Sequence, residues 1–226
     1  MITVDDLKSA NVPLFAELSA DDLNGMTLDI QEKSFAPWEI LFNQQDTSND
    51  VYILLEGKLL ALYWTEAGRE IIFTRFSEGD LFGEMAALDG GERSLAIVAR
   101  SDVRVLVMPQ ATFLELFNRV PAIRTFVVNS LVARVRHLTA KNLELTTFSV
   151  GQRVASFLIS MALERDVLEK GGVINDAPTH AEIAASIGAN REMVSRAVTQ
   201  LVKKKAIRSA RQRIELVDPD ILSDVL

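Results

Sequence analysis

Short apolar and β-branched runs separated by turn residues fill the first half of the chain, from about Phe35 to Pro109. Five of these runs have the length and composition of β-strands, and they span residues 51–55, 58–64, 70–76, 94–99 and 103–108. Glycine recurs every eleven residues in turn-like contexts, at Gly57, Gly68, Gly79 and Gly90. Strands and turns at this regular spacing are typical of a jelly roll, so we expect the first half to form a β-roll.

The hydrophobic pattern becomes helical after Pro109. Residues 111–117 form one short helical segment, and Pro121 opens a much longer one, because proline favours the first helical position. Spacings of three and four residues along the longer helix connect Val128, Leu131, Val135, Leu138, Asn142 and Leu145. Such a seam, with one polar core position, predicts a dimer-forming coiled coil. A helix packed against its own domain is the alternative, because the seam covers only a few heptads.

The third part of the chain begins after the long helix. Ser149 is the predicted N-cap of a helix that continues to Ala162, and a polar, glycine-containing stretch at residues 169–178 follows as a separator. We therefore expect an α+β protein with three parts: a β-roll in residues 1–120, a dimerisation helix in 121–148 and a winged helix-turn-helix domain in 149–226.

Residues 179–196 carry the most specific pattern in the chain. Thr179 and Glu182 have the spacing of a capping box, and Gly188 stands where a turn between two helices needs a left-handed backbone. Apolar positions are spaced to join the two helices at Ile183, Ile187, Val194 and Ala197. Asn190 is the predicted N-cap of the second helix. An ordinary helical hairpin with a charged face is the alternative, but all these features match by chance only rarely.

The second of these helices is expected to read base edges in the DNA major groove. Its polar face carries Arg191, Glu192, Ser195 and Arg196. Arginine can bond guanine through two donors, and glutamate can accept from the cytosine amine. The candidates for phosphate contacts are Thr179, Lys203, Lys204, Lys205 and Arg208. Residues 201–217 would complete the unit as the end of the helix and a small basic hairpin.

The net charge of −7 argues against nucleic-acid binding only when it is taken as a single number. Residues 1–121 hold 9 basic and 20 acidic side chains, or −11, whereas residues 122–226 hold 15 and 11, or +4. Between residues 178 and 214 the balance is 8 against 2, or +6. The positive charge is therefore concentrated where a polyanion would bind, although a solvated basic face has the same composition.

Composition excludes several classes of protein. The chain has no cysteine, which removes disulfides and Cys-ligated metal centres, and its only histidines are His137 and His180. We find no nucleophile–base pair and no set of metal ligands, so we expect no enzyme and no metal site. No apolar run approaches the length of a membrane span, and the N-terminus lacks the apolar core of a signal peptide. A cytoplasmic protein without a membrane partner is expected.

A second specific segment lies late in the predicted β-roll. Gly83 lets the backbone approach a ligand closely, and the short turn of helix from Glu84 to Leu88 offers free N–H groups to an anion. Arg93 can add a charge-assisted bond to a phosphate. Glu84 would be repelled by that phosphate, so its role would be to accept from a neutral hydroxyl such as that of a ribose. A surface Glu–Arg ion pair beside a turn explains the same residues, and the pattern alone leaves both interpretations open.

The segment Phe82-Gly83-Glu84-Met85-Ala86-Ala87-Leu88, with Arg93-Ser94-Leu95-Ala96 after a spacer, resembles the phosphate-binding cassette of cyclic-nucleotide-binding domains. Together with the helix-turn-helix, it makes residues 14–217 similar to the cyclic AMP receptor protein and FNR (Crp/Fnr) superfamily, nearer to the cyclic AMP receptor branch. The effector-binding residues that this resemblance implies are Gly83, Glu84, Met85, Arg93, Ser94 and Thr139. It also implies a homodimer, RNA polymerase as a partner, and a palindromic DNA site with half-sites similar to TGTGA.

Two departures from the family pattern concern the effector. Leu138 occupies the position where the cyclic AMP receptor has a threonine that helps to read adenine, so cyclic AMP is expected but cyclic GMP stays open. Gln45 stands where a turn glycine is usual. The alternatives are a regulator of the same family with a different effector or none, and a nucleotide-sensing module whose basic face binds a protein. A membrane-surface role for the run Lys203 to Lys205 is weaker, because large aromatic residues do not interrupt it.

Overall fold

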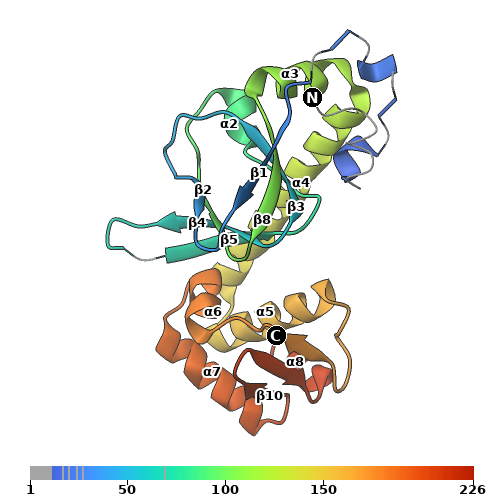
Figure 1. Ribbon diagram of the computed structural model, residues 1–226. Helices are drawn as coiled ribbons and strands as arrows, with labels where there is room; N and C mark the ends of the chain where they lie inside the picture. Colours follow the sequence, from blue (N-terminus) through green and yellow to red (C-terminus); the bar gives the residue numbers. More distant parts are fainter. Residues whose placement is uncertain (1–11, 17, 20, 24, 27, 69) are drawn as a thin grey trace. The chain divides into compact units, whose positions relative to one another are not determined.

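The computed structural model describes residues 12–16, 18–19, 21–23, 25–26, 28–68 and 70–226. The chain divides into two compact units, residues 1–135 and residues 136–226 (Figure 1). The division falls inside the long helix α4 (Pro121–Thr147) rather than at its end, where we had expected a boundary. Each unit therefore includes a part of the same helix.

Two antiparallel four-stranded sheets form the β-roll of the first unit (Figure 1). One has the order β1 (Gln31–Phe35), β8 (Val103–Met108), β3 (Val51–Glu56) and β6 (Leu81–Phe82). The other has the order β2 (Ile40–Phe42), β7 (Ala96–Ala99), β4 (Leu59–Trp64) and β5 (Glu70–Phe76). Both sheets contribute buried side chains to one core, among them Leu54 and Val105 from the first sheet and Leu59 and Ile97 from the second. The expected jelly roll is confirmed.

Short helices close one side of this roll. They are the 3-10 turns η1 (Pro13–Phe15) and η2 (Asp21–Leu23), α2 (Glu84–Asp89), α3 (Gln110–Arg119) and the beginning of α4. Their apolar side chains form a second core with β3 and β8, in which Phe15, Phe113 and Ile123 are fully buried. Within α4 this burial continues to Val127. The alternative in which the helix packs on its own domain is thus correct for its first two turns.

The predicted turns adopt the backbone that the glycine pattern requires. Gly57 has φ +100°, and a Cβ there would lie 2.3 Å from the carbonyl oxygen of Asp102, so no side chain fits between β3 and β4. Gln45 adopts φ +68°, the conformation of the glycine that is usual at this position. The first strand begins at Gln31, earlier than the expected start near Phe35. It was not predicted because β1 is largely exposed and lacks an apolar run.

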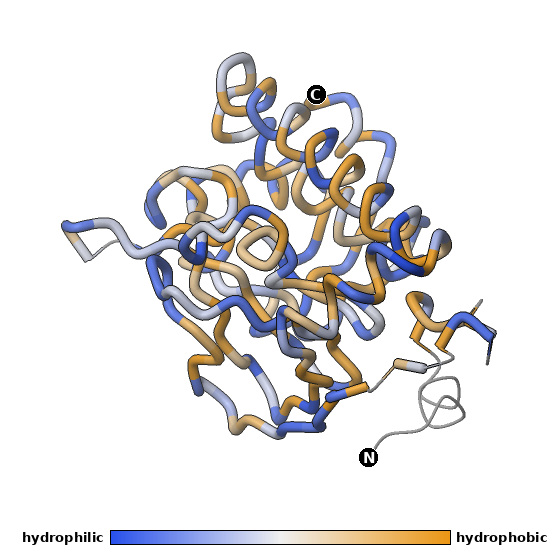
Figure 2. The backbone as a smooth tube through the Cα atoms, turned by 90° about the horizontal axis from the view of Figure 1, so that it is seen from above, coloured by the Kyte–Doolittle hydropathy of each residue, from blue (hydrophilic) through white to orange (hydrophobic). Residues whose placement is uncertain are grey.

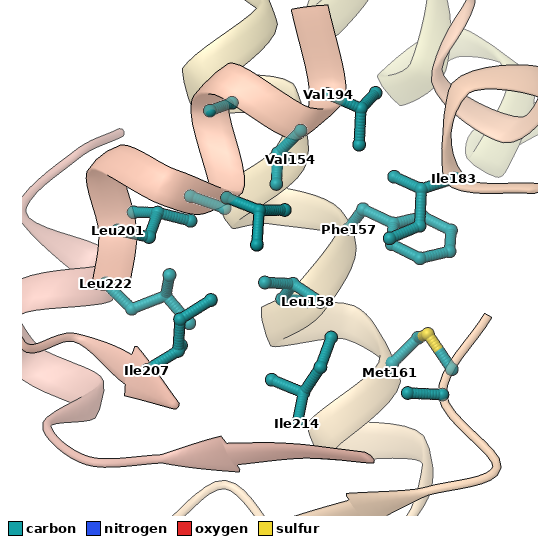
Figure 3. Packing of buried hydrophobic residues seen from close by; sticks show 14 of the residues in the cluster. Val154, Phe157, Leu158, Met161, Ile183, Val194, Leu201, Ile207, Ile214 and Leu222 are labelled. Atoms are coloured by element: carbon teal, nitrogen blue, oxygen red, sulfur yellow. The ribbon is translucent and has the colours of Figure 1, made fainter. Parts of the chain in front are cut away.

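The second unit is a winged helix-turn-helix. Besides the end of α4 it contains α5 (Val150–Glu164), β9 (Val173–Asn175), α6 (His180–Ile187), α7 (Arg191–Lys203), β10 (Ile207–Ala210), β11 (Arg213–Leu216) and α8 (Pro219–Ser223). Figure 3 shows its core, where side chains of α5, α6, α7 and the small sheet point toward one another. Leu158, Ile183 and Val194 in this core are completely inaccessible to solvent. The two predicted helices of the motif are therefore joined as expected.

One predicted separator is wrong. Residues 169–178, expected to be a linker, contain β9, which pairs with β11 so that Ile174 faces Ile214 in a sheet of order β10-β11-β9. The strand is only three residues long, too short for its own hydrophobic pattern to be recognised. Its stabilisation comes from long-range pairing and from the burial of Ile174.

Apolar and polar residues are interleaved along the backbone of both units (Figure 2). Within the described part of the chain, no helix is long and apolar enough to cross a membrane.

Candidate effector site and nucleic-acid interface

The loop between α2 and β7 carries Arg93, whose guanidinium lies inside the β-roll. The residue is 3% exposed. Its Nη1 donates to the carbonyl of Gly83 at 2.8 Å, its Nη2 to the carbonyl of Asp50 at 2.7 Å and its Nε to the Ser48 hydroxyl at 3.2 Å. A guanidinium has five N–H donors, so these three bonds leave two for a further acceptor.

The guanidinium of Arg93 bonds to carbonyl and hydroxyl oxygens and lies over ring faces, while carboxylates act on it only from a distance. Among the described residues it forms no ion pair, and its guanidinium carbon lies 4.1 Å from the centre of the Phe42 ring and 5.8 Å from that of Tyr52. Burial lowers the pKa of Arg93, while Tyr52 and the nearby Asp50 act in the opposite direction. A buried cation in these surroundings favours an incoming anion.

Aromatic rings surround this arginine. Tyr52 stacks on Phe82 with ring centres 5.3 Å apart, and Phe82 in turn lies 4.9 Å from Phe76. Phe76 also contacts the guanidinium of Arg134, 5.6 Å from its ring centre. The two arginines therefore lie at opposite ends of one aromatic cluster, which we had not predicted because its members come from β2, β3, β5 and β6.

Glu84, the first residue of α2, is 1% exposed and paired with the long helix. Its Oε1 accepts from Nη1 of Arg134 at 2.7 Å, and Arg134 also donates to the carbonyl of Leu81. Burial raises the pKa of Glu84, although Arg134 and Arg93 both favour its charged form. The other oxygen, Oε2, is buried and accepts no hydrogen bond from the residues that the structure describes, so it can accept from a donor group on a ligand.

Gly83 makes the close packing of these groups possible. It has φ +82°, and a Cβ at this position would lie 2.7 Å from Nη1 of Arg93 and 2.9 Å from the carbonyl oxygen of Asp50. Met85 and Ser94, the other expected effector contacts in this unit, are exposed on α2 and on the loop before β7. Thr139, the remaining expected effector contact, belongs to the second compact unit.

Sequence reasoning missed Ser48, Asp50 and Arg134. Ser48 and Arg93 are 45 residues apart, and Glu84 and Arg134 are 50 apart, so no local pattern joins them. The alternative in which Glu84 and Arg93 form a surface ion pair is wrong, because both residues are buried and each has other partners.

The helix-turn-helix is built from local signals. Thr179 and Glu182 form the predicted capping box, in which the Thr179 hydroxyl accepts from the amide of Glu182 and the Glu182 carboxylate accepts from the amide of Thr179. Gly188 ends α6 with φ +63°. Asn190 occupies the N-cap position of α7 as predicted, but its side chain makes no capping bond to the described residues of the helix.

The expected base-reading residues lie along the first turns of α7. Arg191, Glu192 and Arg196 are exposed, whereas Ser195 is half-buried and its hydroxyl lies 2.8 Å from Nδ1 of His180 on α6. The lysines Lys203, Lys204 and Lys205 are exposed at the end of the helix. Arg208, expected to bind phosphate, instead pairs with Glu215 across the β10–β11 hairpin at 2.8 Å, so its charge is partly neutralised.

Most of the predicted dimer seam is open to solvent within a single chain. Val128 is 46% exposed, Leu138 52% and Leu145 51%, and Asn142 is also exposed. Leu131 differs, because it packs partly on the core of the β-roll. Exposed apolar residues at heptad spacing are what a second helix would cover.

Two protein families match this chain, one for each unit. Residues 32–120 match the family described as a cyclic nucleotide-binding domain, and residues 152–225 match the family described as a Crp-like helix-turn-helix domain. The chain belongs to the Crp/Fnr superfamily. It is therefore a DNA-binding transcription regulator with a cyclic-nucleotide-binding domain, as its motifs predicted.

Relatives of this Crp/Fnr protein extend over nearly its whole length. A protein of Thermus thermophilus named cyclic AMP receptor protein is 28% identical over 214 residues, 94% of this chain and 96% of the relative. The global nitrogen regulator of Synechococcus elongatus is 26% identical over 207 residues, 89% and 92% of the two chains. A solved Crp/Fnr-family regulator from Thermus thermophilus is 25% identical, with a TM-score of 0.71 over 86% of this chain and 97% of the other.

Proposed function

We propose that this protein is a homodimeric regulator that binds a cyclic nucleotide in the β-roll and, in response, a palindromic DNA site. Cyclic AMP is the first candidate and cyclic GMP the second. The observation that carries the proposal is the buried Arg93, which forms no ion pair among the described residues, beside a buried Glu84 oxygen that accepts no hydrogen bond from them.

The chemistry of these groups fits a nucleoside cyclic phosphate. The two remaining N–H donors of Arg93 suit a phosphate diester, whose negative charge would give the buried guanidinium a direct ionic partner. A ribose hydroxyl is neutral and can donate to Oε2 of Glu84, whereas a second phosphate there would be repelled. Met85 and Ser94 would complete the contacts to ribose and phosphate, and Thr139 would contact the purine.

Arg134 connects such a ligand to the dimer helix. A hydroxyl that donates to Glu84 weakens the hold of that carboxylate on Arg134, which is a residue of α4. The seam that would meet the partner helix consists of Val128, Leu131, Val135, Leu138, Asn142 and Leu145. Effector binding is thus expected to change the pairing of the two long helices and, through them, the spacing of the two recognition helices.

The DNA-reading surface fits half-sites similar to TGTGA. Arg191 and Arg196 can each bond a guanine, and Glu192 can accept from a cytosine amine on the complementary strand. Phosphate contacts are assigned to Thr179, Lys203, Lys204, Lys205 and, when its ion pair opens, Arg208. A regulator that acts in this way works in the cytoplasm with RNA polymerase as a partner.

Calorimetric titration of the purified protein with cyclic AMP and cyclic GMP tests the effector. The wild type should bind one nucleotide per chain, and Arg93→Lys should weaken binding at least tenfold, because lysine has no planar donor pair. Arg104→Lys is the matched control, since Arg104 is an exposed arginine on β8 that pairs with Glu32 and Glu56. No heat with either nucleotide, from protein that binds DNA, would overturn the effector assignment.

Selection of DNA from a randomised library, with and without nucleotide, tests the proposed nucleotide-dependent DNA binding. Palindromic sites that are enriched only in the presence of the nucleotide are the expected result. Enrichment that does not depend on nucleotide would favour a regulator with another effector or none. No enrichment under any condition would favour a module that binds a protein.

A further inference from the structure

A hydrogen bond joins the two helices of the helix-turn-helix on their polar side. Nδ1 of His180, the first residue of α6, lies 2.8 Å from the hydroxyl oxygen of Ser195, in the middle of α7. Both side chains are half-buried. Ser195 is one residue from the exposed Arg196 and lies on the same helical face as Arg191 and Glu192.

A serine hydroxyl can read a base in two opposite ways. It has one hydrogen to donate and two lone pairs to accept with, and its hydrogen rotates toward whichever acceptor is fixed beside it. When the hydroxyl donates to His180, it presents only lone pairs elsewhere, and these select a base amine. When it accepts from His180, its hydrogen stays available and selects a base carbonyl or ring nitrogen. The ring nitrogen therefore decides which base Ser195 prefers.

The 2.8 Å contact is compatible with either tautomer, and a neighbouring polyanion favours the one whose hydrogen is on Nε2. In this form Nδ1 is an acceptor, and Nε2 carries the only ring N–H, to which a phosphate can be the acceptor. The opposite tautomer would leave a bare lone pair on Nε2 near the phosphates that Thr179, the neighbour of His180, is expected to bind. Ser195 would accordingly donate to His180 and accept from DNA.

The surroundings of His180 allow it to be changed without disturbing the core. A hollow of about 300 Å³ lies beside it, lined by Thr179 and by the hairpin turn from Ser209 to Gln212. His180 lines this hollow and belongs to the first turn of α6, outside the hydrophobic core of the unit. Variants at this position are therefore expected to fold.

We propose that His180 is a positioning residue for DNA specificity: it orients the Ser195 hydroxyl so that it accepts from a base amine, on adenine or cytosine. This inference rests on the proposed DNA-binding function and adds a determinant that does not itself touch a base. It differs from a phosphate contact, because loss of a phosphate contact weakens binding to all sequences alike.

The test begins with the preferred duplex found by selection. Ser195→Ala identifies the base pair that Ser195 reads, as the position where base preference disappears. At that pair the amine is then removed, by purine in place of adenine or by pyrimidin-2-one in place of cytosine. Removal should weaken binding of the wild type about five- to tenfold and leave Ser195→Ala unaffected, as expected for the loss of one hydrogen bond.

Two substitutions of His180 then distinguish the effect of its hydrogen-bond acceptor from the effect of its ring size. His180→Phe keeps a ring but has no acceptor, so it should lose the preference for the amine while still binding non-specific duplex as the wild type does. His180→Asn offers an oxygen acceptor and should retain the preference to within about twofold. An unchanged amine preference in His180→Phe, or equal loss in both variants, would overturn the inference. Absence of any selected duplex for the wild type would instead refute the proposed function.

Discussion

Gly83 and Gly90 begin and end the same short helix, α2, and they allow the crowding around Arg93 to be measured. Both have a left-handed backbone, with φ +82° and +71°. A Cβ on Gly83 would lie 2.7 Å from Nη1 of Arg93, whereas a Cβ on Gly90 would have nothing within 4 Å. Gly83→Ala and Gly90→Ala therefore introduce the same backbone strain, and only the first introduces a clash.

The expected magnitudes follow from these contacts. A left-handed alanine costs about 1–2 kcal/mol at either position. At Gly83 the guanidinium must also move, and the loss of one hydrogen bond from a charged donor adds about 1.5–3 kcal/mol. We thus expect Gly90→Ala to lose about 1–2 kcal/mol of unfolding free energy and Gly83→Ala about 2.5–5 kcal/mol. Because Arg93 would be displaced, nucleotide affinity should fall at least tenfold in Gly83→Ala alone.

Scanning calorimetry measures the stability difference, and titration with cyclic nucleotide measures the affinity. The calorimetric transition of the β-roll should shift further for Gly83→Ala than for Gly90→Ala, by several degrees. Equal shifts, together with unchanged nucleotide affinity in both variants, would refute the reasoning. The guanidinium would then tolerate a neighbouring methyl group, and Gly83 would not control its position.

Three further predictions concern the long helix. Arg134→Met should destabilise the protein by about 3–5 kcal/mol at pH 7, because it leaves the buried Glu84 without its ion-pair partner, and addition of Glu84→Gln should recover most of the loss in urea unfolding. The pKa of Glu144 is lowered: burial opposes this shift, but hydrogen bonds from Ser156 and a neighbouring lysine outweigh it. A carboxyl whose pKa is lowered in the folded protein contributes stability at pH values above its pKa in the unfolded chain. Ser156→Ala should therefore cost about 1–2 kcal/mol at pH 7, and the cost should shrink as pH falls below about 4. A cost independent of pH would contradict this. Leu138→Asp should weaken self-association at least a hundredfold in analytical ultracentrifugation, since each dimer would contain two such changes. An unchanged dimer would show that this position does not lie in the dimer interface.

Local interactions explain which parts of the fold were predictable. Ser149, Thr179 and Gly188 fix helix ends through contacts with residues at most four positions away, so their spacing alone identified the boundaries. The strand runs of the β-roll were also recognisable, because their buried faces leave continuous apolar segments. β9 was missed because a strand of three residues carries no pattern of its own.

The candidate site was only half predictable, for a related physical reason. Gly83, Glu84 and Arg93 lie within one short segment, so their chemistry could be read together. Their buried partners, including Asp50 and Arg134, come from strands and a helix that only the folded chain brings near. The sequence also did not indicate that Ser195 would be engaged by a histidine from the preceding helix, since the two residues are 15 positions apart.

The division into two units has a spectroscopic consequence. All the tryptophan and tyrosine of the chain, namely Trp38, Tyr52, Tyr63 and Trp64, lies in residues 1–135, and the second unit contains none. Intrinsic fluorescence of the natural chain therefore follows only the β-roll, while the helix-turn-helix is silent at those wavelengths. Comparison of the natural chain with a variant that carries one added tryptophan in the second unit would then report the unfolding of both units. The order in which the two units unfold could be measured in this way.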